Sequence, residues 1–182
     1  KYSNKDIFNG INKYFVRTES ASLKYSMYGV GPYFSLDSII KAMVTTIYSH
    51  RCFNSKDTKC DIYLLKWRND ISIDKEFRIF VYKNDLTAIS QQKTYETSDW
   101  IINSDKNQIA KYIIDFFHDS IRDKLSNISS YTVDIAFIDN GLYFIEANSF
   151  GSQYAAGSSL FHWKNDHDKL YDDSVINIRT FI

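Results

Sequence analysis

Residues 131–148 contain two β-prone runs on either side of a short Asp-Asn-Gly stretch at positions 139–141. This pattern predicts a β-hairpin. Successive residues of a strand point to opposite faces of a sheet, so the length of the loop decides which side chains share a face. The hairpin constrains the fold strongly, because it requires an antiparallel sheet and sets the direction of its acidic side chains.

Two loop lengths suit this hairpin, and they differ in where they place Asp134. A two-residue Asn-Gly loop puts Asp134 on the face opposite Glu146 and Asn148. A three-residue Asp-Asn-Gly loop, with Gly141 in the left-handed position of a bulge, puts Asp134 directly across from Glu146. We predict the three-residue loop, because it gathers the polar side chains on one face. The core-facing side would then hold Val133, Ile135, Phe137, Tyr143 and Ile145, and the polar face would also hold Ile138 and Phe144.

Carboxylates that face each other, as predicted for Asp134 and Glu146, repel unless a cation lies between them. Carboxylate and amide oxygens suit Mg²⁺, which usually takes one or two protein carboxylates and completes its shell with water and substrate phosphates. Asp134, Glu146 and Asn148 are therefore candidate ligands of metal-bound ATP. On the pattern alone, an ordinary solvated face of the sheet is the simpler interpretation.

The rest of the chain predicts an α+β fold. β-prone runs indicate strands at 14–17 and 61–67 and a hairpin of 76–82 with 86–91. Helical spacing indicates one helix after the N-cap Ser35 and a long helix from the N-cap Asp105 to about Leu125. The first helix would turn inward Ile39, Ile40, Met43, Val44 and Ile47. The polar stretch 68–75 is a candidate hinge, so we expect two units, residues 1–67 and 68–182.

Three cations are candidates for contacts with phosphate groups. Arg78 alternates with Phe77 and Ile79, so its guanidinium lies on the face opposite those apolar side chains. Arg17 ends the first predicted strand, and Lys24 lies in the polar loop that follows, whose backbone amides could also approach phosphates. Each is equally well interpreted as a surface cation. The sequence has no Gly-x-x-x-x-Gly-Lys-Ser/Thr motif, which excludes a P-loop protein.

Composition excludes several functional classes. Lys plus Arg and Asp plus Glu each number 22, so no overall field attracts nucleic acid or an anionic membrane. No apolar run reaches the roughly 18 to 20 residues of a membrane span, and we expect a soluble, cytoplasmic protein. The chain begins at Lys1 rather than Met, which leaves room for upstream sequence.

We expect Cys52 and Cys60 to be reduced thiols, and no zinc-ligand spacing links them to His50, His118, His162 or His167.

Several short motifs occur in an order that is specific when they are taken together. They read Glu-Phe-Arg-Ile-Phe-Val, Leu-Thr-Ala-Ile-Ser-Gln, Asp-Phe-Phe, Val-Asp-Ile-Ala, Phe-Ile-Glu-Ala-Asn-Ser-Phe-Gly and Ser-Leu-Phe-His-Trp. In this order and spacing the chain resembles the cell division cycle protein 123 family, strongly over residues 62–163 and more weakly over 15–26.

The resemblance implies a two-lobed ATP-grasp fold of the α+β class, with antiparallel sheets and a long helix in the second lobe, that holds ATP and Mg²⁺. Eukaryotic members of that family are assembly factors for translation initiation factor 2. Position by position, the resemblance implies an adenine hinge at Leu65, Lys66 and Trp67, phosphate contacts from Arg17, Lys24 and Arg78, a place near the ribose for Glu76, and Mg²⁺ ligands in Asp134, Glu146 and Asn148.

Two segments differ from the family pattern. Residues 20–25 stand where eukaryotic members have Trp-Ser-Ala-Pro-Arg-Asp and keep only the positive charge of Lys24, and residues 146–148 read Glu-Ala-Asn in place of Asp-Phe-Asn. Abundant Ile, Asn, Lys, Ser and Tyr indicate an AT-rich source, as in a divergent viral or microbial member.

We expect an ATP-dependent assembly factor with a protein partner. The alternatives are an ATP-dependent carboxylate-amine ligase working through an acyl phosphate, and a degenerate ATP-grasp scaffold that binds no nucleotide.

Overall fold

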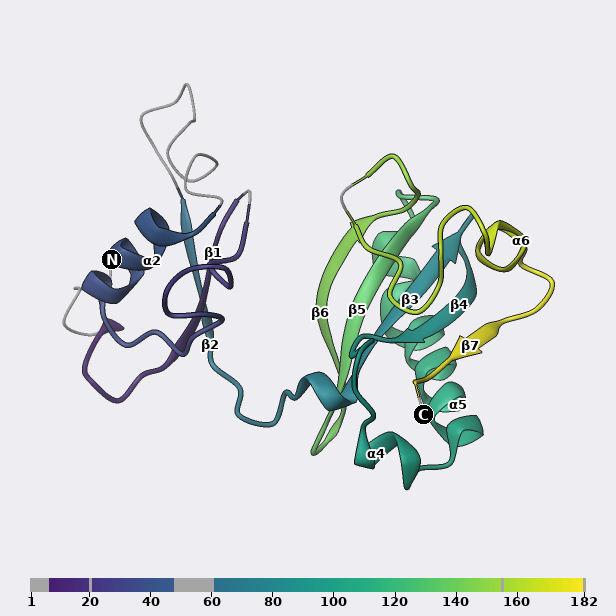
Figure 1. The fold of residues 1–182 in the computed structure, drawn as a ribbon, viewed down its shortest axis with the longest axis horizontal. Helices are drawn as coiled ribbons and strands as arrows, with labels where there is room; N and C mark the ends of the chain where they lie inside the picture. Colours follow the sequence, from purple (N-terminus) through teal and green to yellow (C-terminus); the bar gives the residue numbers. More distant parts are fainter. Residues whose placement is uncertain (1–6, 20, 48–60, 155, 182) are drawn as a thin grey trace. The chain divides into compact units, whose positions relative to one another are not determined.

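The computed structural model of the chain describes residues 7–19, 21–47, 61–154 and 156–181. The chain divides into two compact units, Lys1–Arg68 and Asn69–Ile182 (Figure 1). The predictions made for Ser20, His50, Cys52 and Cys60 fall outside the described residues. Within the described ranges, no helix is both long enough and apolar enough to cross a membrane.

Among its described residues, the first unit packs a two-stranded sheet against helix α2 (Leu36–Thr45). Strand β1 (Tyr14–Thr18) is antiparallel to β2 (Ile62–Lys66), which confirms both predicted strands. Helix α2 (Leu36–Thr45) begins after Ser35, whose Oγ accepts a hydrogen bond from the Ser38 N–H at 3.2 Å, as an N-cap should. The core of this unit is formed by Val16, Leu23, Tyr33, Ile39, Ala42 and Met43.

The buried face of α2 is narrower than predicted. Ile39 and Met43 are buried, but Ile40 and Val44 are exposed, and Ile47 lies beyond the end of the helix. A two-stranded sheet covers only a narrow stripe of a helix, so apolar residues one position away from that stripe stay in contact with solvent.

The second unit contains a five-stranded sheet among its described strands, in the order β6-β5-β3-β4-β7. Neighbours are antiparallel except β4 and β7, which are parallel, so the sheet is mixed rather than purely antiparallel as predicted. The strands are β3 (Glu76–Tyr82), β4 (Asp85–Gln91), β5 (Tyr131–Ile138), β6 (Gly141–Ser149) and β7 (Asn177–Arg179). The predicted β3–β4 hairpin is confirmed, and Lys83 and Asn84 form its two-residue turn with φ of 52° and 68°.

Helix α5 (Lys106–Phe116) covers one face of this sheet (Figure 1). Its predicted N-cap is confirmed, because Asp105 Oδ1 accepts hydrogen bonds from the N–H groups of Asn107 and Gln108. The predicted helix does not run as one α-helix to Leu125: it continues as a π turn, Phe117–Ile121, and a 3-10 turn, Asp123–Leu125. The wider π turn lets Phe117 and Ile121 both reach the core.

The opposite face of the sheet is covered by the segment that follows β6. Phe150, Phe161 and Leu170 from this segment pack against Phe80 and Ala88 of the sheet. The segment includes the short helix α6 (His167–Leu170). Elsewhere in the unit, the 3-10 turn Ile73–Lys75 precedes the β3–β4 hairpin, and the short helix α4 (Asp99–Ile102) follows it. The side chains on that face of the sheet therefore lie close to the backbone of the segment that follows β6.

The loop of the β5–β6 hairpin corrects one prediction and confirms another. Ile138 pairs with Gly141, so the loop has two residues, not the predicted three. The register then shifts by one residue at Ile145, and Asp134 lies directly across from Glu146, as predicted. A bulge adds one residue to one strand, so it produces the register that a longer loop would have produced.

Between the turn and the bulge, the faces of β6 are therefore opposite to those predicted. Leu142, not Tyr143, packs against the core cluster, and Phe144 lies across from Ile135 rather than on the polar face. Beyond the bulge, the predicted faces hold again, because Glu146 and Asn148 pair with Asp134 and Thr132.

Candidate functional site

The centre of the candidate site is an ion pair between neighbouring strands. Arg78 on β3 lies directly across from Asp134 on β5. The Arg78 Nε and Nη2 atoms donate hydrogen bonds to Oδ1 and Oδ2 of Asp134 at 2.7 Å and 2.6 Å. The two side chains are 11% and 7% exposed. This bidentate geometry matches the fork of a guanidinium to both oxygens of a carboxylate.

Strand alternation explains why two charged residues occupy neighbouring buried positions. The residues on either side of Arg78, Phe77 and Ile79, point into the core beneath α5, and Val133 and Ile135 do the same on β5. Arg78 and Asp134 therefore point to the other face, under the segment that follows β6. Each charge is tolerated there because the other one pairs with it.

Arg78 also contacts the covering segment. Its Nη1 donates a hydrogen bond to the backbone oxygen of Gly157 at 2.6 Å. The same segment is tied to the sheet through the Leu160 N–H, which donates to Ser90 Oγ at 3.0 Å. A guanidinium carries five N–H groups, and the bonds to Asp134 and Gly157 use three of them.

The three predicted metal ligands are brought together on one face. Asp134 lies across from Glu146, and Asn148 Nδ2 donates to Asp134 Oδ2 at 3.4 Å. The cluster thus combines two carboxylates, one amide and one guanidinium.

The donor chemistry of this cluster fits Mg²⁺ that arrives with phosphate ligands. In the described part of the chain, no group of three or more His, Cys, Asp and Glu side chains could hold a metal ion. A Mg²⁺ ion at Asp134, Glu146 and Asn148 would therefore need oxygen ligands from outside the protein, and phosphates supply such oxygens. Arg78 keeps one side of Asp134 occupied, so a metal would share this carboxylate with the guanidinium.

Glu76, predicted to lie near a ribose, belongs to the same strand as Arg78. It is the first residue of β3 and is half-buried. It lies two positions before Arg78 on this strand, so both side chains lie on the same face of the sheet. The structure therefore brings together five of the predicted site residues in the second unit: Glu76, Arg78, Asp134, Glu146 and Asn148.

The other five predicted residues, Arg17, Lys24, Leu65, Lys66 and Trp67, belong to the first unit. Arg17 on β1 pairs with Tyr63 and forms an isolated bridge with Ser22, which brings the polar loop beside the strand. The Nζ of Lys24, in that loop, lies 5.3 Å from the centre of the Tyr25 ring. Lys24 is exposed, as a residue that contacts a ligand can be.

The three residues predicted to form the adenine hinge follow one another at the end of β2. Leu65 and Lys66 are exposed strand residues, and the Trp67 N–H donates to the backbone oxygen of Lys13 at 2.8 Å. The Trp67 ring lies against Gly31, where a Cβ atom would come within 3.3 Å of it. Gly31 has a φ of 115°, so glycine is required for both conformation and space.

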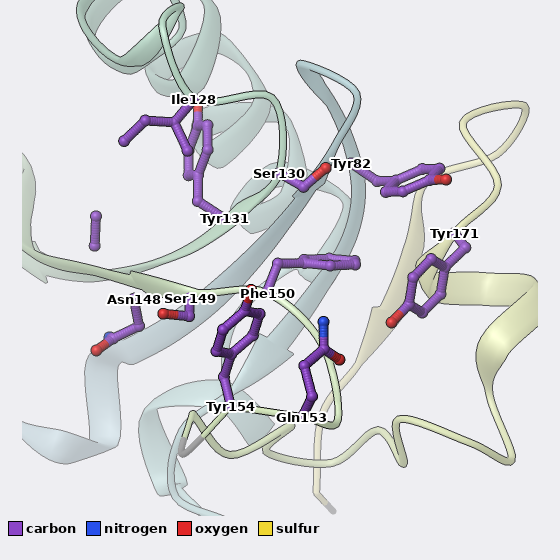
Figure 2. A pocket seen from close by; sticks show the side chains of 11 residues that line it. Tyr82, Ile128, Ser130, Tyr131, Asn148, Ser149, Phe150, Gln153, Tyr154 and Tyr171 are labelled. Carbon is purple, nitrogen blue, oxygen red and sulfur yellow. The ribbon is translucent and has the colours of Figure 1, made fainter.

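Sequence reasoning missed a pocket beside Asn148. This cavity of about 690 Å³ is lined by the ends of β3 and β6, the start of β5 and the segment that follows β6 (Figure 2). Its rings include Tyr82, Phe150 and Tyr171, of which Phe150 is buried and the other two are half-buried. Aromatic residues separated along the chain carry no local pattern that distinguishes a pocket wall from a core.

A second ion pair was also missed. Arg179 on β7 donates two hydrogen bonds to Asp166, at 2.7 Å and 2.5 Å. Asp166 Oδ2 also accepts from the His162 N–H at 2.9 Å. The bonds from Arg179 hold the pKa of the Asp166 carboxyl well below its usual range, although burial acts in the opposite direction. This pair fastens the covering segment to the edge strand β7.

Together, the fold and the site define a mixed α/β protein with a paired, polar centre on one face of its larger sheet. The D123 family model matches residues 35–180. The chain belongs to the D123 family, and its resemblance to the cell division cycle protein 123 family is confirmed.

Similar proteins place this family match in context. A translation initiation factor eIF2 assembly protein of Candida albicans is 27% identical over 130 residues, which span 66% of this chain and 36% of the relative. The chain thus matches about a third of the length of that curated protein. Cdc123 from Schizosaccharomyces pombe and its C-terminally truncated form superpose with TM-scores of 0.72 and 0.73 at 14% identity, over 98% of this chain and 76% of theirs. That likeness shows the fold.

Proposed function

We propose that this chain is an ATP-grasp assembly factor that binds Mg²⁺ and ATP and acts on a translation initiation factor 2 complex. The observation that carries the proposal is the buried Arg78–Asp134 pair with Glu146 and Asn148 on the same face of the sheet. Membership of the D123 family and the name of the Candida albicans relative support the choice of partner.

In this proposal, Asp134, Glu146 and Asn148 hold Mg²⁺, which neutralises charge on the nucleotide's phosphates. The two remaining N–H groups of Arg78 bind a phosphate oxygen, while its other three keep their bonds to Asp134 and Gly157. Glu76 binds the ribose. The residues expected to contact the nucleotide from the first unit are Arg17, Lys24, Leu65, Lys66 and Trp67.

The charges of the cluster explain why metal and nucleotide would bind together. Asp134 and Glu146 carry two negative charges when ionised, and Arg78 cancels one of them. A bare divalent cation would leave this partly buried cluster with an excess of positive charge. The phosphates of ATP supply the missing negative charge and further ligands for the metal.

Calorimetric titration of ATP with Mg²⁺ into the intact chain tests nucleotide binding. The informative variant is Glu146→Gln, which removes a proposed metal ligand without removing the partner of Arg78. Its matched control is Asp139→Asn, which removes one negative charge from the exposed turn of the same hairpin. Loss of binding in Glu146→Gln alone is expected. Equal binding by both variants would place the metal elsewhere, and no binding by the folded wild type would favour a scaffold without nucleotide.

The assembly role is tested separately, with purified translation initiation factor 2 and this chain. Association with the factor, without consumption of ATP that depends on a small carboxylate, is expected. The ligase alternative predicts such carboxylate-dependent consumption. None of the described residues that line the pocket beside Asn148 is cationic, so they offer no counter-charge to a substrate carboxylate.

A further inference from the structure

The pocket beside Asn148 has a lining that is rich in aromatic rings and without charge. Among the described residues, it is lined by Tyr82, Ile128, Ser130, Tyr131, Ala147, Asn148, Ser149, Phe150, Gln153, Tyr154 and Tyr171 (Figure 2). No Asp, Glu, Lys, Arg or His is among these described residues. A charged ligand group would lose water there without gaining a counter-charge, so the lining favours a neutral ligand.

Three rings of this lining hold one another in place. The centre of the Tyr82 ring lies 5.8 Å from that of Phe150 and 5.1 Å from that of Tyr171. Phe150 and Tyr171 are themselves 5.0 Å apart, edge to face. Side chains fixed in this way lose little conformational entropy when a ligand packs on them, so the wall is prepared for binding.

The pocket is also lined by the end of an edge strand. Ala147, Asn148 and Ser149 are consecutive residues of β6, and all three line it. Consecutive strand residues point to opposite faces, so a cavity that touches all three lies against the backbone of the strand. Among the described strands, β6 is an edge strand that pairs only with β5. Its nine residues include no lysine or proline, the residues that commonly protect such an edge.

We propose that this pocket and the adjoining end of β6 bind an extended, uncharged peptide segment of a protein partner, with one aromatic side chain against the wall of rings. The peptide's backbone would pair with β6, as in other cases of strand addition to a sheet edge. The amides of Asn148 and Gln153 and the hydroxyls of Ser130 and Ser149 would bind its remaining polar groups. The proposal rests on the assembly role proposed above, because such a role requires a surface that holds a partner.

The probe is the capped peptide acetyl-Thr-Thr-Tyr-Thr-Thr-amide, titrated into the ¹⁵N-labelled chain without metal or nucleotide. Shifts of the amide signals of Ala147, Asn148, Ser149 and Gln153 are expected. Peptides with Glu or Lys at the central position should bind at least about tenfold more weakly, because their charge would be desolvated. Equal binding of the charged peptides, or no shift with any peptide, would overturn the proposal.

Two tyrosine variants form a matched pair. Tyr154 lines the pocket and is 53% exposed, and Tyr112 on α5 lies outside it and is 52% exposed. Because both side chains are half in solvent, each alanine variant should fold. Tyr154→Ala should weaken binding of the tyrosine peptide about tenfold and Tyr112→Ala should leave it unchanged. Equal affinity in the two variants would exclude the pocket as the peptide site.

A single-stranded oligouridylate serves as a competing probe, because aromatic rings also stack on bases. Displacement of the peptide by this oligonucleotide would point to nucleic acid and overturn the proposal. Peptide binding is measured without ATP, so the two proposals fail separately. If the chain binds ATP but not the peptide, only the pocket proposal is contradicted. If the chain binds the peptide but neither ATP nor the initiation factor, only the proposed function is contradicted.

Discussion

Arg78 and Asp134 are separated by 56 residues in the chain, yet their side chains form two hydrogen bonds of 2.7 Å and 2.6 Å across neighbouring strands. The pair lies under the segment that follows β6 and is held on its other side by the backbone oxygen of Gly157. A charged pair in this position is both a structural element and the centre of the proposed ligand site, and its two roles can be separated by experiment.

Removing one partner of the pair should destabilise the second unit. Asp134→Ala leaves a buried guanidinium without its counter-charge, and such a loss costs about 3 to 5 kcal/mol. Urea unfolding measures the change, with the exposed Asp139→Ala in the same hairpin as the control. The double variant Arg78→Met with Asp134→Leu should lose less stability than Asp134→Ala, because no unpaired charge remains. A double variant that is less stable than Asp134→Ala would contradict this account.

Metal alone should bind far more weakly than metal with ATP. Arg78 already neutralises Asp134, so a bare divalent cation meets only part of the negative charge. Binding of Mn²⁺, followed by electron paramagnetic resonance, should strengthen at least about tenfold when ATP is present. Glu146→Gln should abolish that gain. Tight Mn²⁺ binding without nucleotide would show that Arg78 does not compete for the carboxylate.

Acid should remove the contribution of Asp166 to stability. Hydrogen bonds from Arg179 hold the pKa of Asp166 below its unfolded value, so this contribution is complete above the unfolded pKa of about 3.9 and declines as pH falls toward the lower folded pKa. The difference in unfolding free energy between wild type and Asp166→Asn should therefore shrink progressively below about pH 4. Urea unfolding at several pH values from 5 downward tests this. A difference that stays constant over the range would mean that Asp166 is not held ionised by Arg179.

Gly31→Ala should destabilise the first unit by about 1 to 3 kcal/mol, because a side chain is strained at a φ of 115° and its Cβ would lie 3.1 Å from the Tyr33 ring. Gly29→Ala is the matched control, since Gly29 has a φ of 62° and open space around its Cβ position. Thermal unfolding of the two variants should show the larger loss for Gly31→Ala. An equal loss would mean that crowding against Tyr33 and Trp67 contributes nothing.

Features that depend on neighbouring residues were predictable. Ser35 and Asp105 were identified as N-caps because a capping side chain bonds to N–H groups two or three residues ahead. The side of Arg78 followed from its alternation with Phe77 and Ile79. The pairing of Asp134 with Glu146 was also predicted, although for the wrong reason. The local pattern could not show that the extra residue is Ile145 in the strand rather than one more residue in the turn.

The sequence by itself determined the strands other than β7, the starts of helices α2 and α5, and the family, because alternation, caps and motif order are all local properties of the chain. It also named the candidate ligands. Only the tertiary structure decided that Arg78 is held by Asp134 and by Gly157, 79 residues away, and that aromatic side chains from distant segments enclose a pocket at the end of β6. Those contacts depend on strand order and on the path of the covering segment. Both are fixed by the packing of the whole sheet, on which no single stretch of sequence reports.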